Sequence, residues 1–110
     1  MPIDLAQLRI IVGDDAEFLQ ELCSTFVTSS TKIVDELRRA VESNDRTLLS
    51  AMAHKLKGGS GSVCARRVGD LAATLEKIAP TSPFADLGHQ VDEIHEALEE
   101  CAGFIEAQVA

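Results

Sequence analysis

The chain has 110 residues, of which 45% are hydrophobic, and its formal net charge is −8. This length and hydrophobic content predict one compact domain over residues 1–110 and exclude a disordered chain. Only 4% of the residues are aromatic, which disfavours β-sandwiches, and the acidic charge makes nucleic acids and anionic membrane surfaces poor partners.

The first half of the chain predicts two helices. Leu5, Leu8 and either Ile11 or Val12 share one face of a short helix from about residue 4 to residue 12, and Gly13 ends it. A long helix follows, from about residue 15 to residue 43. Its predicted apolar stripe consists of Phe18, Leu22, Phe26, Ile33, Leu37 and Val41.

The second half predicts three more helices. Asp45 is a suitable N-cap for the next one, and a bend at residues 64–66 separates it from a fourth helix that Pro80 ends. Ser82 and Pro83 are expected to be the N-cap and first residue of the last helix. Its predicted inward positions are Phe84, Leu87, Val91, Ile94, Leu98, Cys101 and Ile105. Because no segment alternates with period two, we expect an all-α fold: an antiparallel four-helix bundle with a short additional N-terminal helix.

Cysteine usage and hydropathy indicate the compartment. The cysteines, Cys23, Cys64 and Cys101, are odd in number and form no C-x-x-C pair, so neither a disulfide framework nor a zinc site is predicted. They are expected to be small buried side chains in a reducing compartment. No apolar run approaches the roughly 18–20 residues that span a bilayer, and the acidic start lacks a signal-peptide pattern. We therefore expect a cytoplasmic protein.

Residues 53–62, AHKLKGGSGS, carry the candidate chemistry. At about 100° per residue, His54 lies roughly 200° from both Met52 and Leu56, which are expected to face the core. His54 should therefore face solvent. A neutral imidazole has one nucleophilic nitrogen near neutral pH, and a phosphoramidate formed there is a reactive phosphoryl donor.

Three glycines follow His54 within the same predicted helix. Each costs about 0.5–1 kcal/mol relative to Ala, so either the helix ends here or something offsets the loss. Gly58 and Gly61 lie on the same helical stripe as His54, where they would open the imidazole to a partner. Lys57 can lean toward this patch and neutralise a phosphoryl group. The alternative interpretation of the glycines is a flexible linker between two helical halves.

Charge is unevenly distributed around His54. No Asp or Glu occurs between residues 46 and 69, whereas this stretch contains five of the ten basic residues. We expect Lys55, Gly61, Arg66 and Arg67 to belong to a partner-binding surface suited to a phosphate or an acidic pocket. Nothing nearby supplies a carboxylate cluster for Mg²⁺, so no metal or cofactor is expected on this chain, and a partner would bring the metal.

Residues 54–60, HKLKGGS, resemble the H-x-L-K-G-[SG]-[SG] signature of histidine phosphotransfer (HPt) domains. Residues 8–15 with Phe18-Leu19, and Leu75-Glu76, also resemble this family, so the resemblance covers nearly the whole chain. It implies a four-helix bundle with an exposed histidine midway along a central helix. It also implies that His54 is phosphorylated, that Lys57 assists and that Gly58 gives access to the imidazole.

The resemblance further implies a function and its partners. We expect a phosphorelay intermediate that accepts a phosphoryl group from a receiver-domain aspartate or a sensor kinase and passes it to a receiver-domain aspartate. Response-regulator receiver domains, which present that aspartate with Mg²⁺, and a hybrid sensor kinase are the expected partners. One departure is Cys64, where the family often has Gly.

Other interpretations compete with this one. A helical adaptor could bind a signalling partner through the same surface without being phosphorylated. An enzyme with autonomous turnover is not expected, because one histidine lacks an orienting base or acid within the motif. The sequence does not suggest ATP binding, so autonomous kinase activity is not expected either. His89 and His95 are expected to be surface or boundary residues of the last helix, and the spacing of Asp92 and His95 lacks the further ligands of a metal site. We expect a monomer.

Overall fold

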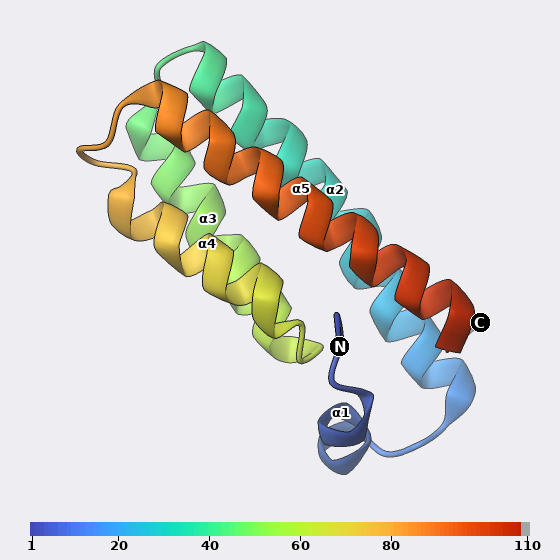
Figure 1. Ribbon diagram of the computed structural model, residues 1–110. Coiled ribbons are helices and arrows are strands. Elements are labelled where there is room, and N and C mark those ends of the chain that lie inside the picture. Colours follow the sequence, from blue (N-terminus) through green and yellow to red (C-terminus); the bar gives the residue numbers. More distant parts are fainter. Residues whose placement is uncertain (109–110) are drawn as a thin grey trace.

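The computed structural model describes residues 1–108, which form five α-helices (Figure 1). They are α1 (Leu5–Val12), α2 (Ala16–Glu42), α3 (Arg46–Ser62), α4 (Arg66–Ile78) and α5 (Phe84–Gln108). This part of the chain contains no strand, so the predicted all-α class is confirmed. Residues 109 and 110 of the predicted domain lie outside the described range.

Aspartate side chains start the first three helices. Asp4, Asp15 and Asp45 each accept a hydrogen bond from the backbone N–H three residues later, at 3.1, 3.1 and 3.0 Å. These bonds satisfy N–H groups that have no partner inside the helix. The predicted cap at Asp45 is thereby confirmed, and the predicted helices in the first half of the chain are present with ends within about one residue of those expected.

The turns after α2 and α3 each place a non-glycine residue in the left-handed region. Asn44 has φ 56° and Cys64 has φ 57°. After α3, the N–H of Ala65 donates to the carbonyl oxygen of Ser60 at 3.0 Å, which is the hydrogen bond of a Schellman helix end. Asparagine visits this conformation more readily than cysteine does, so the backbone is more strained at Cys64.

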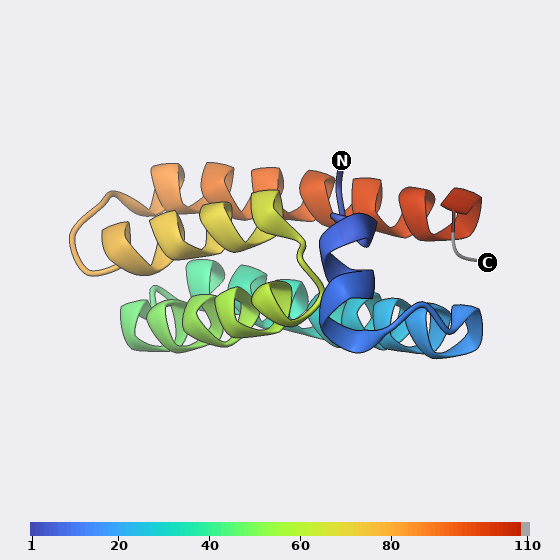
Figure 2. The ribbon, with the colours of Figure 1, turned by 90° about the horizontal axis from the view of Figure 1, so that it is seen from below.

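The helices form an antiparallel bundle in two layers (Figures 1 and 2). The long helices α2 and α5 run side by side, and the shorter α3 and α4 pair along part of their length. α1 lies across the end of the α3–α4 pair, beside the turn that joins them (Figure 2). There the backbone N–H of Asp4 donates to the carbonyl oxygen of Cys64 at 3.1 Å. The predicted bundle with a short additional N-terminal helix is therefore confirmed.

The core is a single apolar cluster to which every helix contributes. Its largest fully buried side chains are Ile3, Leu8, Leu19, Leu37, Leu49, Leu56, Leu75, Leu87, Ile94, Val63, Val68 and Val91. The predicted position of Phe18 in the core is wrong, because its side chain is 48% exposed. Leu19 and Cys23 begin the buried stripe of α2 instead, and Phe18 lies one helical position away from it.

Two predicted boundaries shift by one residue. The bend between α3 and α4 occupies residues 63–65 rather than 64–66, because the Schellman bonds close before α4 begins. Pro83 rather than Ser82 is the N-cap of α5, since its carbonyl oxygen accepts from the N–H of Leu87 at 3.1 Å. Among the described residues, no helix combines the length and apolar character needed to cross a membrane.

Candidate functional site

α3 continues without a break through the glycines that follow His54. The interpretation of these glycines as a flexible linker is therefore wrong. The helix persists because it is fixed along its length by packing: its buried face packs between α2 and α4, and tertiary packing outweighs weak local propensity. The residues of that face are Leu49, Ala53, Leu56 and Ser60.

His54 projects from α3 into solvent beside α4. Its side chain is 69% exposed, in agreement with its predicted phase, and its Nδ1 lies 2.9 Å from Oε2 of Glu76 on α4. The other oxygen of the same carboxylate, Oε1, lies 3.2 Å from Nζ of Lys57. One carboxylate therefore holds both the imidazole and the ammonium group, and the three side chains form a bridge across the α3–α4 seam.

The contact with Glu76 fixes which imidazole nitrogen can react. An ionised carboxylate can only accept hydrogen bonds, so Nδ1 must carry the hydrogen of this pair. In a neutral ring, the lone pair is then on Nε2. The arrangement presents a nucleophilic nitrogen with a carboxylate behind the ring.

Glu76 remains ionised at neutral pH. The hydrogen bond from Lys57 is the largest cause that holds the pKa of its carboxyl below the ordinary value, and His54 acts in the same direction. Partial desolvation opposes them without reversing the sign. The carboxylate is thus available at neutral pH as a hydrogen-bond acceptor for the imidazole.

The glycines leave the surface beside His54 open. A Cβ atom added at Gly58 or Gly61 would meet no heavy atom within 4 Å, so neither glycine is required by packing in this structure. Both lie on the helical stripe of His54, as their spacing predicts. Another molecule can approach the imidazole closely along this stripe.

Two grooves flank the bridge along the α3–α4 seam. One, of about 590 Å³, extends from His54 and Glu76 toward Arg46 and Pro80. The other, of about 640 Å³, is lined by Lys57 and Gly61 of α3, the start of α4, and Gln7 and Ile11 of α1. The imidazole therefore lines one of two separate grooves along this seam.

The basic residues within residues 46–69 differ in their positions and contacts. Arg66 and Arg67 are exposed at the start of α4, and Arg66 lies 3.5 Å from Asp4. Lys55 lines grooves between α2 and α3, away from the stripe of His54. Arg46 is used in the fold: it donates to the carbonyl oxygens of Ala79 and Ser82 at 2.8 and 2.7 Å.

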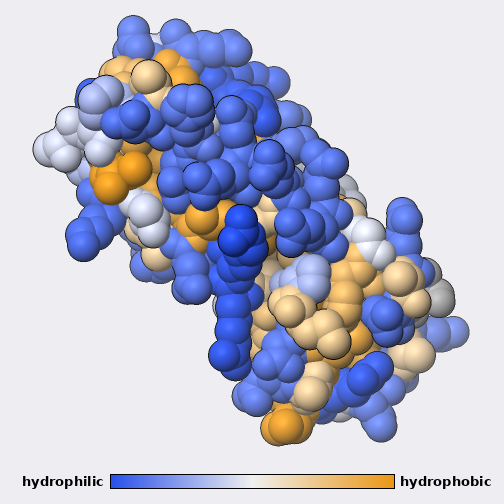
Figure 3. Space-filling model, in the orientation of Figure 1, coloured by the Kyte–Doolittle hydropathy of each residue, from blue (hydrophilic) through white to orange (hydrophobic). Residues whose placement is uncertain are grey.

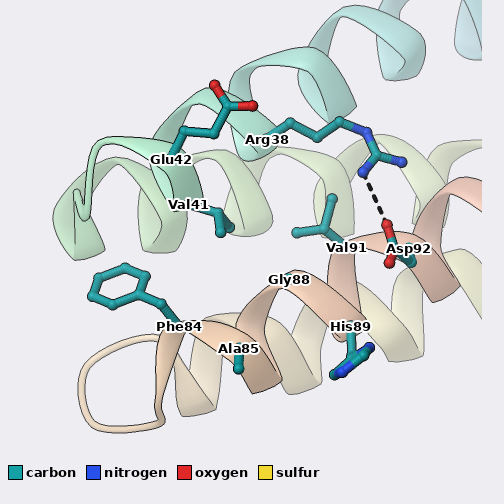
Figure 4. Close-up of a pocket in the computed structure, with 9 residues that line it drawn as sticks. All are labelled: Arg38, Val41, Glu42, Phe84, Ala85, Gly88, His89, Val91 and Asp92. Atoms are coloured by element: carbon teal, nitrogen blue, oxygen red, sulfur yellow. Dashed lines mark hydrogen bonds and ion pairs between the residues drawn. The ribbon is translucent and has the colours of Figure 1, made fainter.

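A separate groove of about 350 Å³ lies between the end of α2 and the start of α5 (Figure 4). Val41, Phe84 and Gly88 contribute to its apolar part, and Arg38 forms an ion pair with Asp92 at its edge. The exposed His89 lines it but has no carboxylate partner there. Among residues 1–108, no group of three or more His, Cys, Asp or Glu side chains could hold a metal ion.

Sequence reasoning missed the role of Glu76. It expected no orienting acid for His54 within the motif, and Glu76 is 22 residues away in the chain. The sequence did contain a signal in the predicted helical hairpin. Two antiparallel helices joined near residue 64 bring residues 54 and 76 to similar positions along the helix axes. The sequence placed Lys57 correctly near His54 but did not show that both share this carboxylate.

Comparisons with known proteins agree with this geometry. The family model of the Hpt domain matches residues 21–104. The crystal structure of histidine-containing phosphotransfer protein B (HptB) from Pseudomonas aeruginosa PAO1 is similar to this chain, with a TM-score of 0.84 and 23% sequence identity over 97% of this chain and 93% of that one. At this identity the likeness shows a shared fold. No curated protein matches the sequence.

Proposed function

Because the chain belongs to the Hpt domain family, we propose that it is a phosphorelay intermediate that carries its phosphoryl group on His54. Family membership supports a role in histidine phosphotransfer within two-component signalling. In the proposed cycle, the chain accepts the group from a receiver-domain aspartate or a sensor kinase and passes it to a receiver-domain aspartate. Mg²⁺ is expected on the receiver domain rather than on this chain.

The proposed transfer uses Nε2 of His54 as the nucleophile. Its lone pair attacks the phosphorus of the partner's aspartyl phosphate, an N–P bond forms, the P–O bond to the aspartate breaks, and the aspartate leaves as a carboxylate. The ring gains positive charge while Nδ1 keeps its hydrogen. The Glu76 carboxylate, 2.9 Å from Nδ1, stabilises that charge. The reverse sequence passes the group to the next aspartate.

Lys57 and Gly58 have supporting roles in this proposal. Lys57 lies on the edge of the site, where its ammonium group can neutralise oxygens of a phosphoryl group on Nε2. Gly58 leaves room for the partner's surface above the ring. Lys57→Ala is therefore expected to slow transfer more than it weakens docking.

The observation that carries the proposal is an exposed imidazole whose Nδ1 is held by a carboxylate while Nε2 remains open. The test is to incubate the chain with a phosphorylated receiver domain and measure acid-labile, base-stable phosphate. We expect His54→Gln to abolish labelling with unchanged helical circular dichroism. His89→Gln and His95→Gln are the matched controls and should label like wild type.

The alternative is an adaptor that binds a partner through this surface without being phosphorylated. An adaptor would bind the receiver domain but take up no phosphate in the same assay. Labelling that persists in His54→Gln would contradict the assignment to this residue. We expect phosphate uptake on His54, because Glu76 holds its Nδ1 and leaves Nε2 open to a partner.

A further inference from the structure

The carboxylate that holds His54 lies in the last turn of its helix. α4 ends at Ile78, and Glu76 is two residues before that end. The last turn of a helix has no intrahelical partners for its carbonyl groups, and helix ends fray more easily than helix centres. Figure 3 shows a mainly hydrophilic surface over α4, so apolar packing holds this helix on its inner side only. The contact between Glu76 and Nδ1 of His54 therefore depends on what holds the end of α4.

Arg46 on α3 binds the residues just after this turn. Its Nη1 donates to the carbonyl oxygens of Ala79 and Ser82 at 2.8 and 2.7 Å, and its Cζ lies 4.3 Å from the centre of the Phe84 ring at the start of α5. Nη1 carries two hydrogens in the rigid guanidinium plane, so the two bonds fix the two carbonyl oxygens relative to each other. Arg46 thus joins the start of α3 to the end of α4 and the start of α5.

These bonds lie at the end of the α3–α4 seam that contains the site. Arg46, Glu76 and His54 line the same groove. The other end of the seam is closed by the short turn after α3, and there a Cβ on Gly69 would lie 3.4 Å from a side chain of α3, so the two helices are closely packed. Apolar packing is not directional, whereas hydrogen bonds are. The bonds of Arg46 therefore determine the orientation of the end of α4 more closely than the buried side chains do.

We propose that Arg46 is a positioning residue for phosphoryl transfer, because its bonds to the end of α4 keep the Glu76 carboxylate against Nδ1 of His54. This inference rests on the proposed function, in which Nδ1 keeps its hydrogen and Nε2 forms the N–P bond. Without the carboxylate contact, the neutral ring can carry its hydrogen on Nε2, and its lone pair is then on Nδ1, which faces α4 rather than a partner. In this proposal Arg46 acts through Glu76 and does not bind the phosphoryl group.

The first test measures the tautomer of His54 and needs no phosphoryl donor. Long-range ¹H–¹⁵N NMR spectra distinguish hydrogen on Nδ1 from hydrogen on Nε2 in the neutral ring, and His54→Gln identifies the signals. We expect the wild-type ring to carry its hydrogen on Nδ1 and Arg46→Met to shift it toward Nε2. Arg46→Lys should shift it less, because its ammonium group can still donate to the carbonyl oxygens. The signals of His89 and His95 should not change.

The second test asks whether Arg46 acts through Glu76. Single-turnover transfer from a phosphorylated receiver domain is measured for Arg46→Met, Glu76→Gln and the double variant. We expect Arg46→Met to slow transfer about fivefold in the wild-type background and by less than about twofold in the Glu76→Gln background, because residues that act through one contact are not additive. The Kd of the receiver domain should stay the same in every variant.

Ile105→Ala is the control for lost stability. Ile105 is buried near the opposite end of α5 from Phe84. This control should lower the melting temperature without changing the tautomer of His54 or the transfer rate. Circular dichroism and a thermal melt check that each variant folds, and Arg46→Lys takes the place of Arg46→Met in both tests if the methionine variant does not fold.

Three results would overturn the positioning role of Arg46. They are an unchanged tautomer in Arg46→Met, a tautomer shift of the same size in Ile105→Ala, and equal slowing in both backgrounds, which would mean that Arg46 contacts the partner directly. None of these results would affect the proposed function. Failure of every receiver domain to label the wild-type chain would overturn the proposed function, and the tautomer would still show whether Arg46 positions Glu76.

Discussion

The side chain of Glu76 links the two other groups at the site. Its oxygens contact Nδ1 of His54 and Nζ of Lys57, at 2.9 and 3.2 Å. It therefore acts twice: it sets the tautomer of the imidazole, and it holds a cation beside the position of an incoming phosphoryl group. In the proposed function, the oxygens of an incoming phosphoryl group would compete with Glu76 for the ammonium of Lys57.

The first prediction concerns the charge on Glu76. Glu76→Gln keeps an oxygen that can accept from Nδ1 but cannot balance positive charge on the ring. We expect phosphoryl transfer through His54 to slow about tenfold, since a charge-assisted hydrogen bond is replaced by a neutral one. Single-turnover transfer from a phosphorylated receiver domain measures this rate. Glu36→Gln removes the same charge from α2, where Glu36 pairs with Arg39, and should leave the rate unchanged.

The free energy of unfolding should depend on pH through the Glu76 carboxylate. Because the pKa of Glu76 is lowered in the folded state, its ionised form contributes stability above the ordinary value of 4.5, and this contribution is lost as the pH falls through the lowered pKa. In urea unfolding, Glu76→Gln should be less stable than wild type at neutral pH, and the difference should vanish in acid. A constant difference across this range would contradict the assigned pKa shift.

The second prediction concerns the backbone at Cys64. A non-glycine residue in the left-handed region costs roughly 1–2 kcal/mol, less any packing that its side chain provides. Cys64 is half-buried, so Cys64→Gly should raise the free energy of unfolding by about 0.5–1 kcal/mol. Asn44→Gly is the control at nearly the same φ. Because asparagine tolerates this conformation, its gain should be smaller, and an equal gain would show that Cys64 is not specially strained.

α3 is the element in which stability and access to the site conflict. Its glycines lower helix propensity, yet the helix is continuous because α2 and α4 cover its buried face. Gly58 lies on the stripe of His54, whereas Gly59 faces the groove between α2 and α3. Substitutions at these two neighbouring glycines can therefore test helix propensity and access to the imidazole separately.

The third prediction uses this pair. Gly58→Ala and Gly59→Ala should each raise the free energy of unfolding by about 0.5–1 kcal/mol, since a Cβ at either position meets nothing within 4 Å. Gly58→Gln should slow phosphoryl transfer by crowding the ring, and Gly59→Gln should not. The measurements are chemical denaturation and the transfer assay. Equal transfer rates in the two glutamine variants would refute the role of Gly58 in access.

At the scale of the whole molecule, charge is segregated. The chain carries a net charge of −8, but residues 46–69 contain no acid. In the structure, the groove that Lys57 and Arg66 line is not purely basic, because α4 contributes Asp70 and Glu76 bridges the adjacent seam. Arg46 is bound to backbone carbonyls, so Arg66 and Arg67 are the residues of this stretch best placed to steer a partner.

The fourth prediction tests this steering. Reversing both charges, Arg66→Glu with Arg67→Glu, should slow association with the receiver domain at low salt, and the wild-type rate should fall as salt is raised. Stopped-flow transfer across a salt series measures both effects. Arg38→Glu with Arg39→Glu makes the same charge change on α2 and should have a smaller effect. If both pairs slow association equally, net charge rather than this surface controls the encounter.

The helices and the phase of His54 could be predicted from local features of the sequence. Apolar spacing, Asp45 and the Pro80 and Gly13 stops are local signals, because each acts within a few residues of the helix end that it marks. The exposure of His54 and its alignment with Gly58 followed from helical geometry alone. The signature around His54 also indicated the family, which the match over residues 21–104 shows.

Contacts between side chains of different helices could not be predicted from the sequence. Glu76 reaches His54 because α3 and α4 pack as an antiparallel pair, and Ile11 reaches the same seam because α1 lies across its end. Periodicity likewise could not distinguish Phe18 from Leu19 at the edge of the core. The physical reason is the same in each case. The sequence of a helix determines which residues share a face, but which helices pack together, and how deeply each residue is buried, depends on how all the apolar faces are buried together.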